Sequence, residues 1–343
     1  MEEVNSKRDY RFDVLKGISI LIVVLGHTFQ YTLPNFGSLL IFNIIWSVQI
    51  PLFITISGYF AISRSTTAFL PRMKKILLRY LLPAVSFYLI SFFIVNRSDI
   101  SGFGRVFNKL ELTLWYLVVL FFLATANNIV CALVKNREYD SFLGFIKYSV
   151  IFFLIIALWL IVYKMGGSTF LGSKFVLYYS VYYWLGIAWK FIKTRMEATK
   201  FSIKSSHMNI FYSGCLAIWA VLLLTYNSYS AADTIMGILP RAICSVCGVF
   251  SIIYFVMKVC ENKEAKNIQW LLWLGTNSLE IYFVHMFIAH NLEFISKNAS
   301  IPEQAIAVVV NMLLLLIASV FIIHFVKKSR LLKLILFGNL KKE

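Results

Sequence analysis

A single histidine, His27, lies inside a long apolar run that directly follows the polar segment at residues 11–17. The run is long enough to cross a bilayer, and an ionisable side chain at membrane depth is costly unless a function retains it. An unperturbed histidine titrates near neutral pH, which suits proton transfer. The segment therefore predicts that polar chemistry reaches into a membrane. The structural alternative is that His27 donates a hydrogen bond to a neighbouring helix.

A second histidine, His285, lies in a later apolar run, and Glu280 precedes it by five residues. Each histidine comes about 15 residues after the start of its run, or roughly 20 Å along a helix, so the two are expected to share a depth. Five residues place Glu280 and His285 on different helical faces. Glu280 is assigned to a polar or catalytic site, or to an ion pair with Lys16, Lys75 or Arg79.

Basic side chains gather at the start of the third apolar run. Arg72, Lys75 and Arg79 follow an i, i+3, i+7 spacing, which lines them along one face of a helix. Together with Arg11 and Lys16 they suit an anionic ligand such as a nucleotide phosphate. The alternative is an ordinary positively charged flank on the cytoplasmic side.

Three further polar or aromatic residues lie within apolar runs. Arg241 follows Pro240 and is expected either to face a cavity or to extend to the outer interface. Trp115 lies near an outer helix end, where it contacts substrate or belongs to an interfacial aromatic belt. Gln49 precedes Pro51, which kinks a helix, and is a candidate to line a polar path.

The elements that must position these groups are membrane-spanning helices. The 343 residues are 59% hydrophobic and 14% charged, whereas a soluble domain is about 25% charged. The net charge of +17 does not indicate nucleic-acid binding, because the basic residues fall between apolar runs. The five cysteines lie in or beside such runs and are expected to be buried apolar residues, and no metal site is predicted.

Runs of the required length predict an all-α polytopic protein, a bundle of about ten transmembrane helices in a single domain over residues 1–343. Most of the 33 lysines and arginines fall on the side that holds both termini, which places both termini in the cytoplasm. Residues 1–13 are too polar for a cleavable signal peptide. The expected spans are residues 14–33, 39–62, 76–95, 112–133, 143–163, 172–192, 208–226, 234–257, 270–295 and 304–326.

Taken together, these residues resemble the acyltransferase 3 family of bacterial membrane acyltransferases. The first-helix signature of the family is similar to residues 11–18 with His27, and its second-helix signature is similar to residues 50–60. The basic stretch ending at Pro83 and the segments 114–117 and 282–285 follow in the family's order. The histidine that often precedes the Leu-Trp of the fourth span is Thr113 here, and where the family has an Arg-x-x-Arg pair this chain has Arg72, Lys75 and Arg79.

The resemblance implies transfer of an acyl group, usually acetyl, from cytoplasmic acyl-CoA to a hydroxyl of an envelope glycan or lipid-linked sugar. His27 corresponds to the family's essential histidine, Arg11 to its first-helix arginine, and Arg79 with Lys75 or Arg72 to its basic pair. His27 would act as general base or transient acyl carrier, and Asp13 would orient a basic partner. Arg11, Lys16, Arg72, Lys75 and Arg79 would hold the CoA, while Trp115, Arg241, Glu280 and His285 would contact substrate.

The expected partners are acyl-CoA, an envelope glycan, the lipid bilayer of the bacterial cell membrane and polysaccharide-assembly proteins, with no permanently bound cofactor. Some members append an extracellular hydrolase-like domain; without it, transfer is expected within the bundle or on a separate partner. The main alternative function is a transporter or flippase of a glycan or small solute, which an inverted repeat would favour. A further alternative is a non-catalytic scaffold subunit, which would leave His27 without a function.

Overall fold

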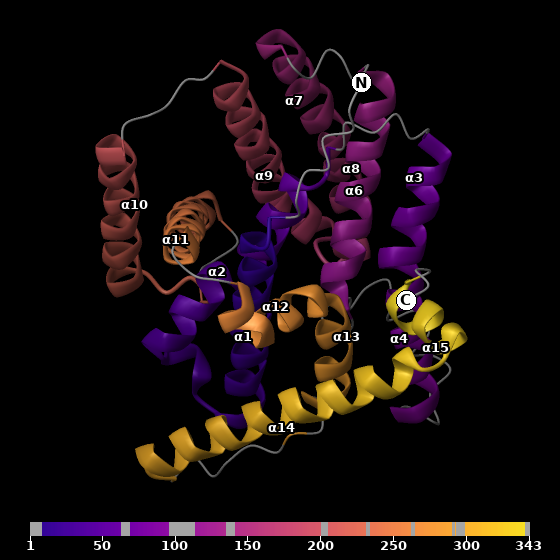
Figure 1. Cartoon of the computed structure of the whole chain (residues 1–343), viewed down its shortest axis with the longest axis vertical. Coiled ribbons are helices and arrows are strands. Elements are labelled where there is room, and N and C mark those ends of the chain that lie inside the picture. The colour runs from indigo at the N-terminus through magenta and orange to yellow at the C-terminus, as the bar shows by residue number, and fades with distance from the viewer. Residues whose placement is uncertain are drawn as a thin grey trace. The chain divides into compact units, whose positions relative to one another are not determined.

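The computed structural model describes residues 9–62, 69–95, 114–134, 141–199, 205–230, 234–261, 265–289, 292 and 299–339. These residues form helices and connecting loops and no strand, which confirms the expected all-α class (Figure 1). The chain divides into two compact units, Met1–Phe53 with Ile203–Val320 and Ile54–Ser202 with Phe321–Glu343. The single-domain organisation and the cytoplasmic placement of both termini stay predictions.

The first unit carries both of the histidines predicted to matter, on α1 and α13. Its helices are α1 (Arg11–Thr32), the first part of α2 (Leu40–Tyr59), α10 (Ser205–Thr225), α11 (Ile235–Glu261), α12 (Gln269–Thr276), α13 (Ser278–Ala289) and most of α14 (Ile301–Lys327). Helix α1 ends at Thr32 because Leu33 precedes a proline and adopts an extended backbone. Helices α10 and α11 lie side by side (Figure 1).

The buried Asn43 on α2 fixes the end of α10 within this unit. Its Nδ2 donates to the carbonyls of Leu223 at 3.2 Å and Tyr226 at 2.8 Å, and its Oδ1 accepts from the Ser228 backbone N–H at 2.8 Å. The last carbonyls of a helix have no partner within the helix, so a buried amide that binds them holds that helix end in place.

The second unit contains the basic stretch. Its helices are the end of α2, α3 (Phe69–Ile76), a π-helical segment (Leu77–Leu81), α4 (Leu82–Val95), α6 (Trp115–Leu133), α7 (Phe142–Ala157), α8 (Trp159–Gly166), α9 (Ser173–Thr199), the end of α14 and α15 (Arg330–Phe337). Helix α15 packs on α4, and Ser86 Oγ donates to the Ile335 carbonyl at 2.9 Å. Gly338 ends α15 with a φ of 61°, a left-handed conformation that glycine adopts without strain.

Seven helices in the described part of the chain are long and apolar enough to cross a membrane, or eight if α12 and α13 form one broken span. The expected count of ten is therefore corrected to seven or eight. The expected span 76–95 is interrupted by the π-helical turn, because Pro83 has no N–H for the Arg79 carbonyl. The expected span 172–192 is the 27-residue α9, whose tyrosines and lysines make it less apolar than the others.

Candidate functional site

The two predicted histidines meet in the first unit. His27 on α1 and His285 on α13 have ring centroids 5.2 Å apart and ring planes inclined by 52°, as their expected common depth requires. Tyr31 stacks on His27 at 6.2 Å, and Tyr282 lies 5.6 Å from His285. Two imidazoles and two phenols therefore form a compact titratable cluster inside an apolar unit.

Backbone contact sets the protonation pattern of His285, which is completely buried. Its Nδ1 lies 2.8 Å from the Ile281 carbonyl, one helical turn earlier. A carbonyl oxygen only accepts, so Nδ1 carries a hydrogen, and Nε2 is the acceptor nitrogen when the ring is neutral. This arrangement lets His285 accept or relay a proton on the side away from its own backbone.

A sharp break in the ninth expected span places Glu280. Helices α12 and α13 meet at 76°, and Asn277 bridges them: its Nδ2 donates to the Trp273 carbonyl at 2.7 Å, and its own carbonyl accepts from the Ile281 N–H at 2.9 Å. Glu280 lies in the first turn of α13, where the helix dipole favours an anion.

The carboxylate of Glu280 is nevertheless isolated. The residue is only 3% exposed, and its Oε2 is buried with no hydrogen-bond partner among the described residues. The ion pair with Lys16 is not formed, because Lys16 Nζ lies 3.8 Å from Asp13 Oδ1 instead. A buried polar atom without a partner is rare and costly in proteins. Glu280 is therefore a candidate to accept a hydrogen bond from a bound ligand.

Asp13 is buried at the start of α1, and its Oδ1 lies 3.8 Å from Lys16 Nζ; a role in orienting a basic partner stays a prediction. Helix α12 packs closely against α1 beside Asp13. The α-carbon of Gly275 lies against the Asp13 carbonyl, and Gly17 lies against the Leu271 carbonyl. Glycine allows the two backbones to approach because it has no Cβ. The crossing thus ties Asp13 and Lys16 to the helix that leads into Glu280.

Replacing Gly275 by alanine tests this crossing. A Cβ at that position would overlap the Asp13 carbonyl and lie 3.0 Å from the Gly17 nitrogen, both backbone atoms that cannot rotate away. We expect a loss of about 1–3 kcal/mol in the free energy of unfolding, measured by denaturant titration in detergent. Gly214 on α10 is the matched control, because a Cβ there meets nothing within 4 Å. A Gly275→Ala protein as stable as Gly214→Ala would contradict the prediction.

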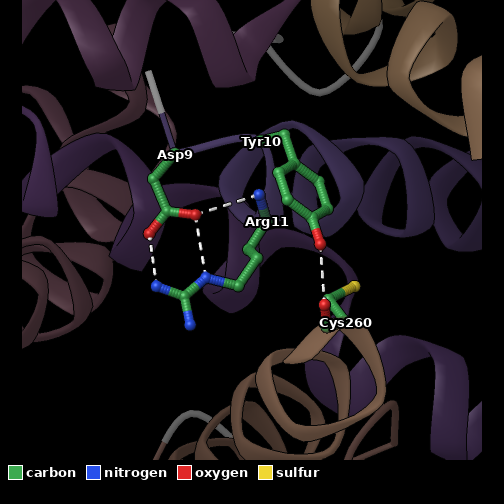
Figure 2. A network of polar contacts seen from close by, with 4 residues as sticks. All are labelled: Asp9, Tyr10, Arg11 and Cys260. Carbon is green, nitrogen blue, oxygen red and sulfur yellow. Dashed lines mark hydrogen bonds and ion pairs between the residues drawn. The ribbon is translucent and has the colours of Figure 1, made fainter. Parts of the chain in front are cut away.

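Arg11 is held by its neighbour Asp9 at the start of α1 (Figure 2). Its Nε and Nη2 donate to the two carboxylate oxygens, each at 2.8 Å, and its backbone N–H donates to Oδ1 at 3.2 Å. Tyr10 Oη donates to the Cys260 carbonyl at 2.7 Å and anchors this segment to the end of α11. Figure 2 shows the third guanidinium nitrogen directed away from Asp9, which leaves a cationic edge for an anion.

The remaining predicted residues lie on other elements. Arg241 is half-buried in α11, directly after Pro240. Arg72, Lys75 and Arg79 belong to the second unit, and the π-helical segment Leu77–Leu81 shifts Arg79 out of the regular α-helical register assumed for their shared face.

Trp115, also in the second unit, stacks on Phe175 at 4.5 Å and on Tyr179 at 5.6 Å. This aromatic packing accounts for its position within the unit, and contact with a substrate stays a prediction.

Gln49, the residue expected to line a polar path, lies beside α1. Gln49 on α2 is 5% exposed, and its side chain lies against Gly26, the residue before His27. Its sequence signal is an amide inside an apolar run, two residues before Pro51. That signal marks a polar residue at membrane depth but does not indicate which helix it contacts.

Comparison with known proteins identifies the family. A family model described as an acyltransferase domain matches residues 9–325, which include every predicted site residue. The nodulation protein NolL of Sinorhizobium fredii is 43% identical over 60 residues, which are 16% of this chain and 16% of that protein. The chain thus matches only a small part of that relative's length. No solved structure matches this chain. Because the family model spans most of the sequence, the chain belongs to the acyltransferase 3 family of membrane proteins.

Proposed function

We propose that this protein moves an acetyl or other short acyl group from cytoplasmic acyl-CoA to a hydroxyl of an envelope polysaccharide or lipid-linked sugar. Its setting would be the bacterial cytoplasmic membrane. The observation that carries the proposal is the contact between the rings of His27 and His285 inside a membrane unit. Family membership supports the reaction class.

In the proposed reaction the acceptor hydroxyl oxygen attacks the thioester carbonyl, and the carbon–sulfur bond breaks to release CoA. His27 takes the proton that the hydroxyl loses and returns it to the departing thiolate. In the covalent variant, the acyl group resides briefly on His27 before the sugar accepts it. His285, with Nδ1 directed to its backbone, positions and polarises His27 in either route.

Charges support the placement of the donor. In the first unit, the Nη1 edge of Arg11 and the Lys16 ammonium are proposed to hold a CoA phosphate. Arg72, Lys75 and Arg79 of the second unit keep their proposed role in CoA binding. Glu280 is proposed to accept a hydrogen bond from the sugar, because its buried Oε2 is an acceptor without a donor in the described chain. Arg241 and Trp115 keep proposed acceptor-contact roles.

Turnover of acetyl-CoA by purified protein in lipid vesicles tests the proposal. We expect release of free CoA, which is slow by hydrolysis alone and faster when the correct glycan is present. Radioactive carbon from ¹⁴C-acetyl-labelled acetyl-CoA should appear on that glycan. Vesicles without protein provide the background rate. If no CoA is released even with candidate envelope glycans, the acyltransferase assignment fails, and uptake of labelled glycan into the vesicles would favour the transporter alternative.

A further inference from the structure

The side-chain oxygen of Gln49 is buried and unsatisfied. The residue is 5% exposed, and Oε1 has no hydrogen-bond partner in the described part of the chain. Buried amide oxygens are nearly always paired, because leaving one unpaired forfeits its hydration without compensation. An apolar side chain of similar shape would pack at this position without that cost, so packing alone does not explain the glutamine.

The location of this oxygen ties it to the catalytic histidine. A Cβ built on Gly26 would lie 2.5 Å from Gln49 Oε1 and 2.9 Å from Ile45 Cγ2, so only glycine leaves room for the amide against α1. Gly26 directly precedes His27, whose ring contacts His285. The amide therefore lies beside the α1 backbone at the level of the two imidazoles.

The same helix allows the side chain to move. Pro51 lies within α2, two residues after Gln49, and a proline removes a backbone hydrogen bond and loosens the preceding turn. Gln49 has three side-chain torsions, and Gly26 offers no side chain to hold its amide. Rotation about these torsions would bring the oxygen from Gly26 toward a group that enters next to His27.

We propose that Gln49 is a substrate-contact residue, whose Oε1 accepts a hydrogen bond from an N–H or O–H of the substrate bound at His27. The proposal rests on the proposed acyltransferase function. Two parts of the reacting pair carry such donors: a second hydroxyl of the sugar acceptor, and an amide N–H of the pantetheine arm of acyl-CoA. Both present the donor that a buried amide oxygen lacks.

Replacing Gln49 by methionine tests the contact, because methionine keeps the length and removes the acceptor. We expect KM to rise about tenfold for the substrate that supplies the donor, with kcat little changed, as for loss of one binding hydrogen bond. A rise in the KM for acetyl-CoA identifies the pantetheine amide, and a rise in the KM for the sugar identifies the hydroxyl. The thermal midpoint of Gln49→Met should equal or exceed that of wild type, since an unsatisfied group is removed.

Two further variants separate binding from packing. Gln49→Glu keeps an oxygen acceptor in the same place and should retain a KM within about threefold of wild type. Gln269→Met makes the same chemical change at an exposed position on α12 and should alter neither KM nor the midpoint. A Gln49→Met protein with unchanged KM, or one that unfolds more easily and loses only kcat, overturns the inference. A wild-type protein that releases no CoA overturns the proposed function and this inference with it.

Discussion

Replacing His27 by alanine should lower the rate of acyl transfer by at least about 100-fold while the protein still folds. A positioned general base contributes about 10²–10⁴ to a rate, and a nucleophilic carrier contributes at least as much. His27 is half-buried, and alanine removes a polar ring from an apolar helix, so helix α1 should persist. CoA release and label transfer in vesicles measure the rate, and circular dichroism with size-exclusion chromatography measures folding.

Replacing His285 by alanine should also lower the rate of acyl transfer, and the rate losses of the two variants should not add. Because the His27 and His285 rings lie 5.2 Å apart, they act on one proton or one acyl group rather than on separate steps. We therefore expect His285→Ala to lower the rate and the double variant to be no slower than His27→Ala alone. Fully additive losses would indicate independent roles and would contradict a shared proton path.

His207 and His324 provide the matched controls for both variants. Each is exposed, on α10 and α14 respectively. Their alanine variants should retain the wild-type rate. Retention of full activity by His27→Ala, with the controls also active, would remove the catalytic assignment of His27.

Replacing Glu280 by methionine should raise stability and lower activity together. Glu280 is 3% exposed with an unpartnered Oε2, so an apolar side chain should increase the free energy of unfolding by about 1–3 kcal/mol. Loss of a hydrogen bond to a charged group costs about 1.5–3 kcal/mol, so kcat/KM for transfer should fall about 10- to 150-fold. Denaturant titration and the vesicle assay measure the two effects on the same preparation.

Glu303 offers a control with the opposite sign. It is also the third residue of its helix, but it is exposed and its Oε2 accepts from the Ser300 backbone N–H at 2.7 Å and from Ser300 Oγ at 2.9 Å. Glu303→Met should lower the free energy of unfolding slightly and leave transfer unchanged. A Glu280→Met protein that is destabilised like Glu303→Met would show that the buried carboxylate has a structural partner.

Much of the secondary structure could be predicted because apolar run length alone selects membrane helices. The expected span 14–33 corresponds to Arg11–Thr32 and the expected span 304–326 to Ile301–Lys327. The failures have local causes. A run such as 76–95 can be apolar enough and still be interrupted, because Pro83 removes a backbone donor and the π-helical turn absorbs the defect.

The candidate site was only partly predictable for a related reason. A common depth of His27 and His285 could be anticipated from their positions in the two runs, although α12 and α13 meet at 76° and the second run is not one straight helix. The isolation of Glu280 could not, because an expected partner, Lys16, lies on the same helix as Asp13 at i+3 and pairs there instead. Local pairs of this kind compete with long-range ones and are not distinguished by composition.

The sequence by itself determined an all-α membrane protein, its family, and the residue types that bring proton chemistry to membrane depth. These properties depend on hydrophobicity and on chemistry carried by single side chains. Only the tertiary structure decided that α12 and α13 break at Asn277, that Gly275 and Gly17 bring α12 against α1, and that Gln49 lies on Gly26. Each depends on how closely two backbones approach, and that distance is set by packing between helices far apart in the chain.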